Sequence, residues 1–157
     1  MNRSRFRLAH AVAGGVALLT ILTFWISTVA VELTGSAEAI VNLKRVIPWG
    51  LLVLVPALVG TGASGSSLVR QRAGRLVRRK TARMRTAAII GAVVLIPCMV
   101  NLAFTASPDL GATFYTVQAV ELAAGATNIT LLGLNMRDGL RLTGRLRSGR
   151  LLTRVRH

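Results

Sequence analysis

Long apolar stretches alternate with short arginine-rich segments along this chain of 157 residues. Four of the stretches reach the length of about 20 residues that a helix needs to cross a hydrocarbon core of roughly 30 Å. They cover residues 8–33, 46–64, 86–106 and 113–135. A bilayer offers no water to unpaired backbone groups, and these stretches lack the alternation of barrel strands, so each is predicted to be a helix. The predicted fold is an all-α membrane four-helix bundle that runs up-down-up-down.

The distribution of basic residues predicts the orientation of this bundle. All but two of the 20 Lys and Arg residues lie in the N-terminal arm, in the link between the second and third stretches, or after Asn135. The other two, Lys44 and Arg45, fall in the predicted link between the first and second stretches. By the positive-inside rule, both termini are expected in the cytoplasm. Residues 1–142 are predicted to form the transmembrane domain, and residues 143–157 a basic, flexible cytoplasmic tail.

A cleaved signal peptide is the competing interpretation of the first stretch. A basic start precedes its apolar run, and the sequence "AEA" at residues 37–39 resembles a cleavage site. However, the apolar run greatly exceeds the usual 7–15 residues or so of a signal peptide. A membrane helix is therefore the favoured interpretation.

The basic link between the second and third stretches is expected to contact anionic lipids. Each Arg or Lys beside a membrane contributes roughly 1 kcal/mol of attraction to an anionic leaflet. Nucleic-acid binding is not expected, because this link contains no aromatic side chains for base stacking and no recognisable binding module. The predicted lipid-contacting residues are Arg70, Arg72, Arg75, Arg78, Arg79, Lys80, Arg83 and Arg85.

The fourth stretch carries polar residues at helical spacing. At about 3.6 residues per turn, Gln118, Glu121, Asn128 and Asn135 fall along one helix face, and such a face is expected to point into the bundle. Asn101 of the third stretch is expected at a depth similar to that of Glu121. Burial disfavours the charged carboxylate unless a cation or several donors compensate. Glu121 is therefore interpreted either as a hydrogen-bonding link between helices or as a proton-carrying or ligand-coordinating group.

His10 is the only histidine within a predicted span. It is a possible ligand of haem b, although an interfacial histidine with a satisfied hydrogen bond is the simpler interpretation. A second haem ligand would have to be Met84, Met136 or a group of another subunit. With one cysteine, Cys98, and no cluster of metal-binding residues, the sequence predicts neither a disulfide nor a metal site.

The stretches "LAHAVAGGVALLTILTFWISTVAVEL", "LLVLVPALVGTGASGS" and "AGATNITLLGLNMRDGLRL" resemble a family of small, uncharacterised bacterial four-pass membrane proteins. The resemblance covers residues 8 to 142. It implies an inner-membrane location and supplies no activity. It also implies that His10, Glu121, Asn128 and Asp138 belong to a recurring pattern.

No catalytic arrangement is recognisable, since the sequence offers neither a nucleophile with a plausible base nor paired carboxylates. The expected function is that of a non-enzymatic accessory or assembly subunit, which binds a membrane-protein partner or a second copy of itself. One alternative is a haem-binding electron-transfer subunit that uses His10. The other is a small dimeric proton-coupled transporter that uses Glu121.

Overall fold

The computed structural model describes residues 3–69 and 75–142, and within these ranges the secondary structure is helical, without a strand. The elements are α1 (Arg3–Thr34), α2 (Ala37–Val46), the 3-10 segment η1 (Ile47–Gly50), α3 (Leu51–Val69), α4 (Arg75–Ile89), the π-helical segment η2 (Ile90–Leu95), α5 (Ile96–Thr105) and α6 (Ala112–Leu142). The predicted tail, residues 143–157, lies outside the described residues.

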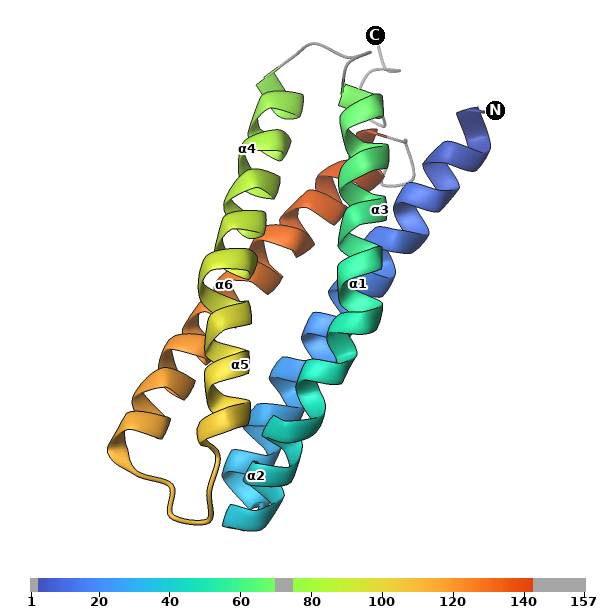
Figure 1. Ribbon diagram of the computed structural model, residues 1–157. Helices are drawn as coiled ribbons and strands as arrows, with labels where there is room; N and C mark the ends of the chain where they lie inside the picture. Colours follow the sequence, from blue (N-terminus) through green and yellow to red (C-terminus); the bar gives the residue numbers. More distant parts are fainter. Residues whose placement is uncertain (1–2, 70–74, 143–157) are drawn as a thin grey trace, which may run out of the picture.

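Consecutive helices merge into four units that are long and apolar enough to cross a membrane. These units are Leu8–Thr34, Ala37–Gly65, Arg78–Thr105 and Ala112–Leu140. For residues 3–69 and 75–142, the prediction of an all-α fold with four such helices is therefore confirmed. Successive units run in opposite directions, and the start of α1 and the end of α6 lie toward the same end of the molecule (Figure 1).

The second unit begins at Ala37 rather than at the predicted residue 46. Ser36 caps α2, because its side chain accepts a hydrogen bond from the Ala39 backbone N–H. Glu38 lies in the first turn of α2 and Lys44 and Arg45 in the last, which suits the helix dipole at both ends. The predicted link that carried Lys44 and Arg45 is thus largely helical, and the turn is confined to Gly35 and Ser36.

The third unit changes helix type in front of a proline. Pro97 has no backbone N–H and its ring crowds the carbonyl one turn earlier. The preceding segment η2 is π-helical, and the Ile96 N–H bonds to the Gly91 carbonyl, five residues back. The wider turn accommodates the proline without ending the helix. Pro56, by contrast, lies inside α3, which continues through it.

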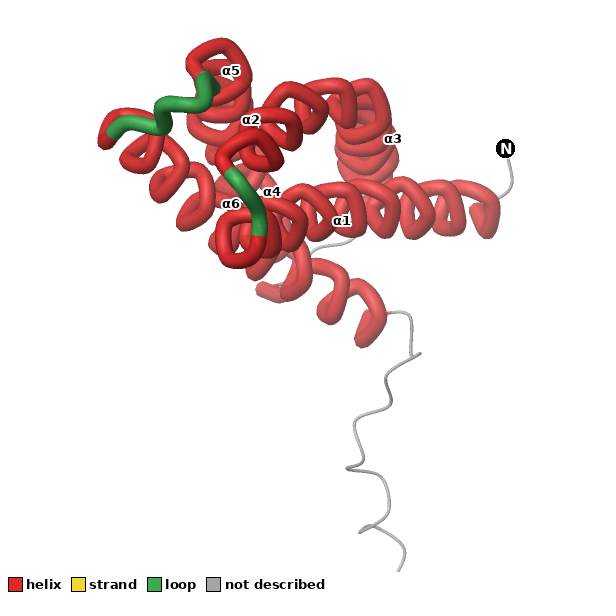
Figure 2. Tube along the Cα trace, turned by 90° about the horizontal axis from the view of Figure 1, so that it is seen from below, coloured by secondary structure: helices red, strands yellow, loops and turns green. Residues whose placement is uncertain are grey.

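Two apolar clusters hold the helices together. The first joins α1 to α3 through Ala17, Ile21, Leu54 and Ala57, with Ile129 and Leu132 of α6 packed against it. The second joins α2, α5 and α6 through Ile40, Val41, Leu102, Ala106 and Phe114. Seen from below, α2 lies between α1 and α5, as this second cluster requires (Figure 2).

A close contact fixes the α1–α3 pair near η1. A methyl group at Gly50 would lie 2.2 Å from Cζ of Phe24, so the aromatic ring of α1 packs directly on the backbone there. Many large apolar side chains point outward instead, among them Leu19, Leu52, Val93 and Phe104. An apolar exterior of this extent is expected where lipid is the solvent.

Candidate functional site: the polar face of α6

The buried face of α6 is polar over most of its length. Gln118, Asn128, Asn135 and Asp138 are all buried, and Gly125 lies between them on the same side. The four amide and carboxylate side chains therefore point toward the other helices and away from the surrounding lipid. This arrangement makes α6 the helix to which polar groups from several other elements bind.

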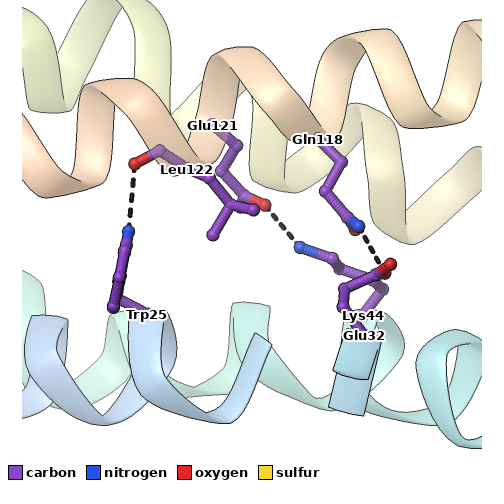
Figure 3. Close-up of polar contacts among 6 residues, drawn as sticks. All are labelled: Trp25, Glu32, Lys44, Gln118, Glu121 and Leu122. Atoms are coloured by element: carbon purple, nitrogen blue, oxygen red, sulfur yellow. Dashed lines mark hydrogen bonds and ion pairs between the residues drawn. The ribbon is translucent and has the colours of Figure 1, made fainter. Parts of the chain in front are cut away.

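Glu121 forms an ion pair with Lys44 of α2 (Figure 3). The Lys44 side chain is only 2% exposed and that of Glu121 13% exposed, so the bilayer and the bundle shield both charges. The ammonium group supplies the compensating cation that a carboxylate needs at such a position. Each charge in the pair neutralises the other.

Two further contacts join α1 to α6 beside this pair (Figure 3). The side-chain amide of Gln118 donates a hydrogen bond to the carboxylate of Glu32. One turn further along α6, the indole N–H of Trp25 donates to the backbone carbonyl of Leu122 over 3.0 Å. Polar side chains in a membrane interior commonly link helices in this way.

A second charged group lies at the opposite end of α6. Arg83 of α4 donates a hydrogen bond to Asp138 over 2.9 Å, and Arg137 lies 4.0 Å from the same carboxylate. Lys80 lies close to Gly139, the residue of α6 that follows Asp138. A methyl group at Gly139 would be 3.2 Å from the ammonium nitrogen of Lys80. Asp138 is buried while Arg83 is partly exposed, so the arginine brings its charge in from the surface.

Not every polar atom of this face is paired. Within the described residues, Oε1 of Gln118, Oδ1 of Asn128 and both amide atoms of Asn135 are buried without a hydrogen-bond partner. A buried polar atom without a partner costs about 1–3 kcal/mol. These atoms are therefore candidates for binding a polar ligand.

His10 lies on α1, where its Nδ1 is 2.9 Å from the hydroxyl oxygen of Ser64 on α3. Met84 of α4 approaches the same place, because a methyl group at Gly65 would lie 3.3 Å from the His10 ring and 4.0 Å from the Met84 methyl. Within the described part of the chain, no group of three or more His, Cys, Asp or Glu side chains could hold a metal ion. Haem ligation by His10 stays a prediction.

Among the other predicted residues, Arg83 and Lys80 approach this face, whereas Asn101 does not. Asn101 is exposed, because Met99, Leu102 and Ala106 turn the opposite side of α5 inward. Of the predicted lipid-contacting residues, Arg78, Arg79 and Arg85 are exposed, whereas Lys80 and Arg83 are half-buried. Arg75 is the first residue of α4, and Arg70 and Arg72 lie outside the described residues.

Sequence reasoning missed Lys44 and Glu32, the partners of Glu121 and Gln118. Lys44 was placed in a link because it follows the polar residues between the first two apolar stretches. The signal that could have found it is the sequence "SAEAIVNLKRV", in which a cap residue precedes Ile40, Val41 and Lys44 at helical spacing. Glu32 was overlooked because it lies near the end of a long apolar stretch.

No protein-family model matches this chain, and neither a search of curated proteins nor a search of solved structures finds a match. The resemblance to four-pass bacterial membrane proteins therefore gains no support from these comparisons. A function for this chain has to be inferred from the arrangement of its helices and from their polar contacts.

Proposed function

We propose that this chain is a non-enzymatic accessory or assembly subunit of a membrane complex. The observation that carries the proposal is the pairing of Glu121 with Lys44. A carboxylate held by a buried ammonium group is a structural link between helices and is poorly suited to carry protons. The contacts of α6 with Trp25, Glu32 and Arg83 serve the same purpose, since they fasten α6 to α1 and α4.

The exposed surface of α3 supports docking to another membrane protein. Leu54 and Ala57 pack toward α1, whereas the other sides of α3 expose Leu52, Val53 and Val59. Gly62 is exposed as well, and a methyl group there would meet nothing within 4 Å. Small residues let a neighbouring helix approach closely in a membrane, where apolar surface alone does not drive association.

The orientation is part of the proposal. The described cations Arg78, Arg79, Lys80 and Arg83 lie at the end of the bundle where α4 begins, and Arg137 lies near the end of α6. By the positive-inside rule we place this end in the cytoplasm of a bacterial cell, with the chain in the inner membrane. The exposed arginines then face anionic headgroups.

Mild detergent extraction of a tagged chain, followed by identification of co-purifying proteins, tests the proposal. A membrane protein recovered at a fixed ratio to the chain is the expected result. The Val59→Trp variant should lose this partner, and Val93→Trp is the matched control, because Val93 is as exposed but lies on η2. Recovery of the wild-type chain as a monomer without a partner would overturn the proposal.

The proton-coupled transporter is the second candidate, favoured by the burial of two opposite charges within candidate spans. Proton-driven uptake of a substrate into proteoliposomes would support this role if Glu121→Gln abolished the uptake. The variant would also have to keep the wild-type elution volume on gel filtration. Equal transport by both proteins would rule out this role for Glu121.

A further inference from the structure

The half of α6 nearest the basic end carries two buried asparagines, Asn128 and Asn135, with amide atoms that have no hydrogen-bond partner among the described residues. Asn135 is 5% exposed, and neither its Nδ2 nor its Oδ1 has a partner among the described residues; Oδ1 of Asn128 is unpaired as well. A buried polar atom is unfavourable unless a polar group reaches it and forms a hydrogen bond. Lipid cannot supply that group, whereas water can both donate and accept hydrogen bonds.

The spacing of the two amides suits a short row of water molecules. Asn128 and Asn135 are seven residues apart, so they lie on the same face of α6 about 10 Å from one another. Hydrogen-bonded oxygen atoms are about 2.8 Å apart, so on the order of two or three water molecules would join the two side chains.

The side chain of Asn128 packs against η2. Its Nδ2 atom lies 3.7 Å from where a methyl group on Gly91 would be, so the amide is directed at the π-helical segment η2. Because Pro97 provides no N–H, a carbonyl of η2 loses its usual helical donor. π-Helical turns often coincide with functional sites for this reason.

Trp25 lies at one end of the row formed by the Asn128 and Asn135 side chains, and charged side chains lie at the other end. A methyl group at Gly125 would lie 2.9 Å from Cδ1 of Trp25, so the indole packs against the backbone of α6 between Asn128 and Glu121. One turn beyond Asn135, Lys80 lies against Gly139, and Arg83 binds the neighbouring Asp138. Charged side chains at the end of a helix bundle are hydrated, so water is present there.

We propose that water enters the bundle at Lys80 and Asp138, passes Asn135, and reaches Asn128, where Trp25 stops it. Asn128 and Asn135 then form a binding site for water or another small molecule that both donates and accepts hydrogen bonds. This site is separate from the Lys44–Glu121 pair, and it does not depend on the role as an accessory subunit.

Thiol labelling of the full chain in lipid nanodiscs tests this proposal, because a cysteine reacts with a charged thiosulfonate reagent only where water makes its thiolate accessible. Cys98→Ser provides the background. Asn128→Cys is compared with Thr127→Cys, which lies at nearly the same depth but on the exposed side of α6. An anionic reagent suits the basic end of the protein.

Asn128→Cys is expected to react at least tenfold faster than Thr127→Cys. Equal rates, or faster labelling of Thr127→Cys, would overturn the proposal. If Asn128→Cys does not elute as a single species with a wild-type circular dichroism spectrum, Asn135→Cys is compared with Met136→Cys, which lies at nearly the same depth on an exposed side of α6, and the same two outcomes apply.

Discussion

Lys44 and Glu121, which are 77 positions apart in the sequence, form an ion pair between α2 and α6. Both charges lie within units long and apolar enough to cross a membrane. Taking two charges out of water is costly, and their mutual attraction offsets that cost only while both are present. The pair therefore makes the bundle sensitive to the loss of either residue alone.

Replacing one partner of this pair should destabilise the protein strongly. Lys44→Met leaves the Glu121 carboxylate without its cation, at an expected cost of about 3–5 kcal/mol in the free energy of unfolding. The double variant Lys44→Met, Glu121→Leu should recover most of that loss, because no charge is then left buried. Unfolding in detergent, followed by tryptophan fluorescence, measures both effects.

Glu38→Gln is the control for this prediction, since Glu38 is an exposed carboxylate in the first turn of α2. Its loss should cost no more than the roughly 0.3–1 kcal/mol of a helix-dipole interaction. If Lys44→Met were as stable as Glu38→Gln, the ion pair would have no structural role.

The Arg83–Asp138 pair should respond unequally to the loss of its two members. Arg83→Met removes the hydrogen bond to a buried carboxylate and leaves it with Arg137, 4.0 Å away, and the nearby Lys80, so a cost of about 3 kcal/mol is expected. Asp138→Asn leaves an arginine that is 24% exposed and can extend toward water, so about 1 kcal/mol is expected. Thermal unfolding of the two variants compares them, and the reverse order of stability would contradict the unequal burial of the two side chains.

Gly125 should tolerate no side chain. Gly125→Ala places a methyl group 2.9 Å from Trp25, which must move and lose its hydrogen bond to Leu122, so a loss of about 1–3 kcal/mol is expected. Gly133→Ala meets nothing within 4 Å and should gain up to about 1 kcal/mol from helix propensity. Similar changes in the unfolding temperature of the two variants would refute the close packing of Trp25 on α6.

The purified protein is expected to be colourless. The accessory role requires no haem, and the contact of His10 with Ser64 already accounts for the histidine as a link between α1 and α3. The visible absorbance spectrum checks this expectation. A Soret band that disappears in His10→Ala would instead support the electron-transfer alternative.

Much of the fold depends on properties that are local in sequence. The four long helices were predictable because each is apolar over about 20 residues or more, so a single polar residue does not hide the pattern. The inward direction of Gln118, Asn128 and Asn135 was predictable as well, because helical periodicity alone places them on one face.

The pairing of side chains was not predictable in the same way. Asn101 was expected beside Glu121 on grounds of depth, but depth does not determine rotation, and the apolar pattern of Met99 and Leu102 turns it outward. The apolar pattern assigns Lys44 to the link between the first and second stretches, where it lies close to other polar residues. In the structure the long side chain of Lys44 reaches Glu121, which is 77 residues away, and a short stretch of sequence does not reveal such a partner.

Reporter fusions measure the membrane arrangement most directly. Fusions within residues 70–74 and at His157 should be active with a cytoplasmic reporter, whereas fusions at Ser36 and Pro108 should be active only with a periplasmic one. This pattern is what four spans with the basic end of the bundle in the cytoplasm predict. A periplasmic signal from residues 70–74, or a chain that stays in solution without detergent, would contradict the account.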